Sequence, residues 1–153
     1  MAHKGDTICG AIVTALGVAS VTGTTKPTGL QVQRNRLIPN DKTEVDAGPI
    51  MGVYWDGEEP ATYEISSQAE RRARFKVEAI TKQSGSSPDA ALWPLIIWMV
   101  KAIMVDMTLG NLCAYIVQGE ASPQYEDLAD GLAAVSIDFI VTYHTAFNDP
   151  ETV

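Results

Sequence analysis

The chain has 153 residues, of which 46% are hydrophobic and 20% charged, and its formal net charge is −8. This length is typical of one domain, and the apolar content argues against wholesale disorder. The acidic balance opposes nonspecific binding to nucleic-acid phosphates, and no apolar run reaches the ~20 residues of a membrane span. We therefore expect a single domain over residues 1–153 that ends in a flexible C-terminal tail and has no membrane partner.

The chain begins with an expected helix at residues 6–19, where apolar side chains recur at helical spacing and Asp6 or Thr7 can cap the first turn. Turn-forming residues fill positions 20–29. Residues 30–37 predict a strand that is polar on both faces, which favours the edge of a sheet.

The next segments alternate between loops and short strands. Residues 38–49 form a long proline-containing acidic loop, and residues 50–55 form a short apolar strand. A turn is expected at residues 56–60, and residues 61–65 resume extended structure that joins or pairs with the strand that follows.

Residues 69–82 alternate between apolar and ionic side chains, which predicts a strand with one face on the core. The ionic positions are Glu70, Arg72, Arg74, Lys76, Glu78 and Lys82. Arg71 and Ile80 break the alternation. This ionic face indicates either simple solubility and edge protection or a surface that meets an oppositely charged partner.

A long apolar helix is expected at residues 88–109. Ser87 suits its N-cap, Pro88 its first position and Gly110 its C-terminal stop, while Pro94 should kink the first turns.

The remaining elements are a strand at residues 113–117, an acidic loop at 120–130 and a final alternating strand at 135–144. The order of elements predicts an α+β fold, with a single mixed or antiparallel sheet and two helices packed on one face. The side chains expected to form one core between sheet and helix are Phe75, Val77, Ile97, Val100, Ile103, Met104, Phe139 and Val141.

The sequence contains no phosphate-binding, nucleophile-elbow or zinc-protease motif, so we expect no enzyme activity, cofactor or metal. His144 should be an exposed residue near a strand end, and Cys9 and Cys113 should be buried free thiols. Trp93 and Trp98 are five residues apart, so either both lie in the core or one of them is an interface anchor.

The final strand and the segment after it carry a further pattern. An aromatic-rich strand end is followed by an acidic residue and proline, at Phe139, Val141, Tyr143, Asp149 and Pro150. Together with the order of elements over most of the chain, this pattern resembles the tail-terminator, or tail-completion, proteins of long-tailed bacteriophages.

The resemblance implies a structural protein of the virion tail or neck, assembled in the host cytoplasm. Such a protein forms a ring, typically a hexamer, that caps the tail tube protein and joins it to the head–tail connector or head-closure protein. Genomic DNA passes through the ring channel without specific binding. The alternatives are another neck or head-closure subunit of the same virion, a small ligand-binding or enzymatic domain, and a structural module with no viral link.

Charge suggests where such a subunit would meet its neighbours. Like charges two residues apart on a strand lie about 7 Å from one another and repel, which favours carboxylates nearby. Glu70 and Glu78 bracket the cations, and acidic loops of a neighbouring subunit can supply more. The candidate subunit or partner interface comprises Arg34, Arg36, Asp41, Glu44, Asp46, Glu70, Arg72, Arg74, Lys76 and Glu78.

Overall fold

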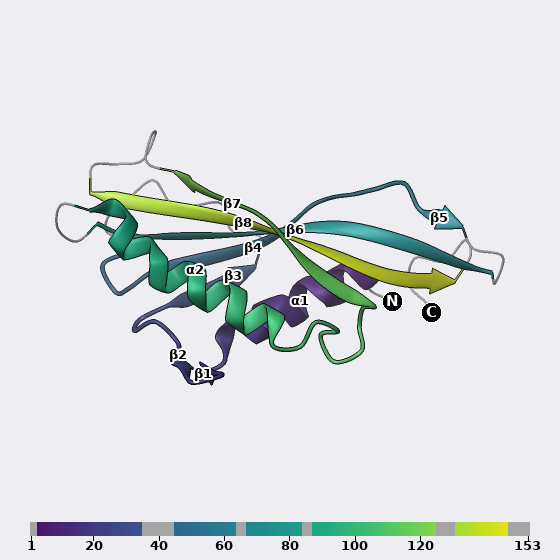
Figure 1. Cartoon of the computed structure of the whole chain (residues 1–153), viewed down its shortest axis with the longest axis horizontal. Helices are drawn as coiled ribbons and strands as arrows, with labels where there is room; N and C mark the ends of the chain where they lie inside the picture. The colour runs from purple at the N-terminus through teal and green to yellow at the C-terminus, as the bar shows by residue number, and fades with distance from the viewer. Residues whose placement is uncertain (1–2, 35–44, 64–66, 84–86, 125–130, 147–153) are drawn as a thin grey trace.

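The computed structural model describes residues 3–34, 45–63, 67–83, 87–124 and 131–146, and these form an α+β fold, as predicted (Figure 1). Its elements in chain order are α1 (Lys4–Gly17), β1 (Ser20–Val21), β2 (Thr24–Thr25), β3 (Gln31–Arg34), β4 (Ile50–Glu58), β5 (Thr62–Tyr63), β6 (Gln68–Lys82), α2 (Pro88–Met104), β7 (Tyr115–Gln124) and β8 (Leu132–Ala146). No helix in these ranges is long and apolar enough to cross a membrane.

The main sheet of the described residues has six strands, in the order β3-β4-β6-β8-β7, with β5 paired to β6 beside the end of β4. Strands β3 and β4 are parallel and the other pairs are antiparallel. The long strands β6 and β8 pair without a register shift from Gln68↔Ala146 to Lys82↔Leu132. Because β3 pairs only with β4 in this order, the predicted edge position of the polar strand is confirmed for residues 31–34.

Both helices pack on the same face of the sheet and share one apolar core with it. Of the predicted core residues, Phe75, Val77, Ile103, Phe139 and Val141 are buried, while Val100 and Met104 are partly buried. The prediction for Ile97 is wrong, because its side chain is 46% exposed.

The buried side of α2 explains the error at Ile97. Leu92, Leu95, Met99 and Ala102 follow one another at steps of three or four residues and point into the core, which places Ile97 on the other side of the helix. Trp98 is fully buried, and its Nε1 donates a hydrogen bond to the Leu16 carbonyl at 3.1 Å. This bond ties α2 to the last turn of α1.

The ends of both helices differ from the prediction. At α1 the Nδ1 atom of His3 accepts from the Gly5 amide at 3.0 Å, so the helix begins before Asp6. At the other helix, α2 ends at Met104 rather than at residue 109, because the Asp106 carboxylate accepts from the amides of Thr108 and Gly110 and folds the chain into turns. Hydrogen bonding, first from the Thr108 hydroxyl, lowers the pKa of Asp106.

Several strands are longer than predicted. Strand β4 continues to Glu58 through the expected turn, and β7 continues to Gln124, so residues 120–124 are strand rather than acidic loop. Each of these strands contains a β-bulge, which breaks the simple alternation from which strand ends are read. The last strand runs from residue 132 to residue 146, and β5 pairs with β6 as expected.

Ile80, an exception in the alternation of β6, has its own apolar environment. It is 1% exposed and packs with Val45, Ile50, Leu132 and Ala134 on the sheet face opposite the helices. A second, smaller core therefore covers one end of that face.

Replacement of Phe75 by alanine should lower the free energy of unfolding by about 3–5 kcal/mol, because the ring is fully buried between sheet and helices. Ile97→Ala is the matched control, since its exposed side chain should change the free energy by well under about 1 kcal/mol in the monomer. Chemical denaturation measures both values. Equal midpoints for the two variants would contradict this packing.

Candidate assembly surface

We call the sheet face opposite the helices the outer face, and it carries the predicted ionic row of β6. In the described residues no helix lies over this face, and the row remains partly or fully exposed. Its members are Glu70, Arg72, Arg74, Lys76 and Glu78. The alternation in the sequence thus placed these five side chains correctly.

A β-bulge in β4 adds acidic residues to the outer face. Between Trp55 and Glu58, three residue steps of β4 oppose two steps of β6. Gly57 lies in the bulge with φ of 106°, a backbone conformation that L side chains rarely adopt. The extra residue reverses the alternation of side chains along β4. Asp56 and Glu59 therefore pair with cations of β6 on the outer face, whereas Glu58 pairs with Arg71 on the helix-side face.

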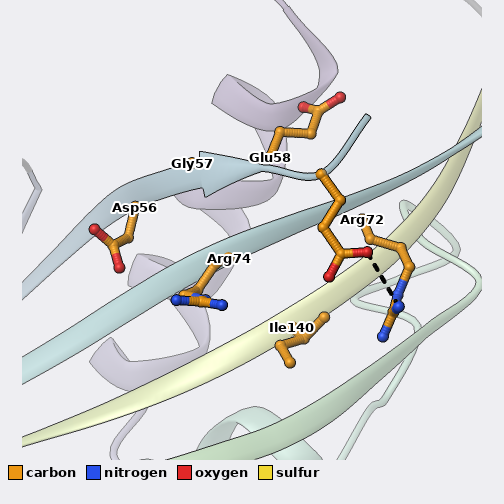
Figure 2. Close-up of a pocket in the computed structure, with 7 residues that line it drawn as sticks. Asp56, Gly57, Glu58, Arg72, Arg74 and Ile140 are labelled. Carbon is orange, nitrogen blue, oxygen red and sulfur yellow. Dashed lines mark hydrogen bonds and ion pairs between the residues drawn. The ribbon is translucent and has the colours of Figure 1, made fainter. Parts of the chain in front are cut away.

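Two cations of the row are paired within the chain. Arg72 Nη1 lies 3.1 Å from Glu59 Oε2, and Lys76 Nζ lies 3.7 Å from Asp56 Oδ2. Figure 2 marks the Arg72 pair with a dashed line. Exposed pairs of this kind contribute only about 0–1 kcal/mol each.

The bracketing carboxylates of the row have other neighbours. Glu70 Oε2 lies 3.9 Å from His144 Nε2, and Glu78 accepts a short hydrogen bond from the Tyr54 hydroxyl. Glu70 and Glu78 bracket the row, as the sequence indicates, but their carboxylates bind His144 and Tyr54 rather than the cations of the row. His144 is partly rather than fully exposed at this strand end.

Arg74 stands in a shallow hollow of about 210 Å³ on the outer face. Asp56, Arg72, Arg74 and Ile140 lie on the same side of the sheet in Figure 2, while Glu58 points away from them. Within the described ranges Arg74 has no ion-pair partner closer than 4.0 Å. The hollow therefore presents an exposed guanidinium beside an apolar side chain.

The helix-side face carries a second polar cluster, which we call the inner cluster: Glu58, Arg71, Tyr143 and Thr145. Arg71 donates to Glu58 Oε1 at 2.8 Å and to Thr145 Oγ1 at 2.9 Å, and the Tyr143 hydroxyl donates to Glu58 Oε2 at 2.8 Å. Burial raises the pKa of Tyr143, and the Glu58 carboxylate raises it further. The inner cluster links β4, β6 and β8 and explains why Arg71 breaks the alternation.

A cavity of about 450 Å³ lies between α1 and the edge of the sheet, and it bears on the enzyme alternative. Its lining includes Asp6, Cys9, Arg34 and Trp55. Burial raises the pKa of Cys9, which keeps its thiol protonated and unreactive near neutral pH. Among the described residues there is also no group of three or more side chains that could hold a metal ion.

The remaining interface candidates do not join the ionic row. Arg34 pairs with Asp6 of α1 beside that cavity, and Asp46 pairs with Lys82 at the far end of β6. Arg36, Asp41 and Glu44 lie outside the described residues. Cys9 and Cys113 are buried free thiols, as predicted.

Sequence reasoning missed the acidic side of the outer face and the whole inner cluster. Asp56 and Glu59 lie in the turn predicted at residues 56–60, although Gly57 between them is a recognisable signal for a bulge.

No family model matches the chain, and no curated protein matches it.

Glu58→Gln should lower the free energy of unfolding by about 1–3 kcal/mol, because it removes the charge that Arg71 faces in a largely buried setting. Glu59→Gln removes a similar carboxylate from an exposed pair and should cost at most about 1 kcal/mol. Urea denaturation of the two variants checks the difference. An equal loss for both would show that the inner cluster does not hold the strands together.

Alkaline pH should weaken the fold. Burial, and then the Asp106 carboxylate, raises the pKa of Cys113 from 9.0 to about 11. A raised folded pKa means that the stabilisation is complete below the unfolded value and is lost as pH rises through the folded value. The free energy of unfolding should thus fall between pH 9 and 11, and Cys113→Ser should flatten that slope. An unchanged slope in this variant would contradict the assignment to Cys113.

Proposed function

We propose that this chain is a ring-forming structural subunit of a phage virion that acts as a tail terminator. The ring would cap the tail tube, bind the head–tail connector on its other side and pass genomic DNA through its channel. The observation that carries the proposal is the outer face, where Arg74, which has no ion-pair partner among the described residues, lies in an open hollow beside paired charges. Such a surface fits a partner that supplies carboxylates.

The open edges of the sheet support a ring. Within the described residues β3 pairs only with β4, and β7 pairs only with β8. These edges differ from one another, so a contact between β7 of one subunit and β3 of the next is head-to-tail, and such contacts close into rings when the rotation permits.

Strand β7 also limits how far such a contact can extend. Tyr115 and Val117 are 43% and 45% exposed near its start, whereas a bulge follows Gln118 and Pro123 lacks an amide proton to donate. Pairing with a neighbour would therefore involve the first half of β7.

The charge of the chain fits passage of DNA. A subunit with net charge −8 gives a ring whose overall field repels phosphates, so DNA can slide through it rather than bind. Of the cations on the outer face, Arg72 and Lys76 are paired within the chain, and Arg74 can contact another protein.

Arg74→Glu should leave the unfolding of the monomer nearly unchanged and should abolish or strongly weaken ring assembly, because the side chain has no ion pair within the described chain. Lys26→Glu is the matched control, since Lys26 follows the β1–β2 hairpin and contacts Gly17 rather than the outer face. Sedimentation and electron microscopy of the particles at low and high salt provide the measurement.

The native protein should form closed rings that bind to tail tubes lacking their terminal ring. Normal rings from Arg74→Glu at every salt concentration would overturn the role of the outer face. Rings that bind isolated heads but not tail tubes would instead favour a head-closure subunit.

A further inference from the structure

Helix α2 carries an exposed stripe with residues four positions apart: Asp89, Trp93, Ile97 and Lys101, which we call the α2 stripe. Trp93 is 59% exposed and Ile97 is 46% exposed, although Trp98 of the same helix is fully buried. Figure 1 shows α2 along the front of the molecule with no other element over it. Two large apolar side chains side by side on an open helix face mark a binding surface rather than a packing surface.

The α2 stripe has opposite charges at its two ends. Side chains four residues apart are neighbours on a helix surface, and at 1.5 Å per residue Asp89 and Lys101 lie about 18 Å apart along the axis. The Lys101 ammonium donates to Thr24 Oγ1 at 2.7 Å and still has two protons for another acceptor. The order along the helix is thus acid, aromatic, aliphatic, base.

We infer that the α2 stripe binds the α2 stripe of a second copy of this chain, with the two helices antiparallel. A two-fold axis beside Leu95 places Asp89 of each copy opposite Lys101 of the other and Trp93 opposite Ile97. The spacing makes this pairing symmetric, because the charged ends lie six residues, and the apolar residues two, from that position.

Charge complementarity selects this partner and this orientation. In the antiparallel arrangement both ends of the contact join a carboxylate to an ammonium, whereas a parallel arrangement would bring like charges together. Helices that meet through ridges of four-residue spacing cross at about 50°. This crossing keeps the apolar centre closest, and the long Lys101 side chain reaches towards Asp89 at each end.

The contact is small, so the dimer should be weak and should dissociate on dilution. A single helix seam buries less than the ~800 Å² per partner of a standard interface. A two-fold contact gives a closed pair and not a ring, so this inference goes beyond the proposed function. The stripe lies on the helix side of the sheet, away from Arg74, which allows the two contacts to be tested separately.

Sedimentation velocity over a dilution series tests the inference. The native protein should show a species of twice the 16.5 kDa chain mass as the first oligomer to form. Asp89→Lys and Lys101→Asp should each weaken dimerisation by about tenfold, because each creates two like-charge contacts. An equal mixture of the two variants should dimerise as strongly as the native protein, since both contacts of the mixed pair are then attractive.

Apolar variants test the centre of the contact. Trp93→Ala should weaken the dimer by about thirtyfold or more, while Val117→Ala, which truncates an exposed apolar side chain on β7, should leave it unchanged. Arg74→Glu should also leave the dimer unchanged, so loss of rings and loss of dimers are distinguishable. A native protein that stays monomeric at every concentration overturns the inference, and so does a variant mixture that fails to recover.

Discussion

The pairing of β6 with β8 is the constraint on which the rest of the structure depends. Both strands have 15 residues, and they pair in one register along their whole length. A shift of one residue would exchange the two faces and bring the ionic row of β6 into the core, so the hydrophobic pattern of both strands fixes the register. Phe75 and Phe139, which oppose one another in this pair, belong to the apolar core that the sheet shares with both helices.

The bulge in β4 allows carboxylates next to it to pair with cations of β6 on both faces of the sheet. A regular strand would have put Glu58 on the outer face with Asp56, and Arg71 would have had no carboxylate on the helix side. The extra residue at the bulge sends Glu58 to Arg71 and Tyr143, and leaves Glu59 for Arg72. A largely buried guanidinium needs a paired acceptor, so the bulge in β4 and the break in the alternation at Arg71 depend on one another.

Periodicity predicted what depends on local pattern. The strand at residues 69–82, its two faces and the α+β class follow from alternation that is nearly unbroken, and all three are confirmed. The core residues on α2 were harder to predict, because most of this helix is apolar and its periodicity is weak. The exposure of Ile97 could have been read from Lys101, a charged residue four positions further along the same helix face. The partners of the outer-face cations depend on strand β4 and its bulge, which are set by tertiary pairing rather than by neighbours in sequence.

The outer face and the α2 stripe differ in the interactions that they offer to a partner. The outer face offers charges that are already partly paired, so a partner there gains specificity and orientation more than free energy, and its binding should respond strongly to salt. The α2 stripe offers Trp93 and Ile97, whose burial stabilises a contact through removal of apolar area from water and depends little on ionic strength. Because the sheet separates these surfaces, occupation of one leaves the other free. On the proposals made above, the chain would form one contact in solution and a second, different contact when it joins a larger assembly.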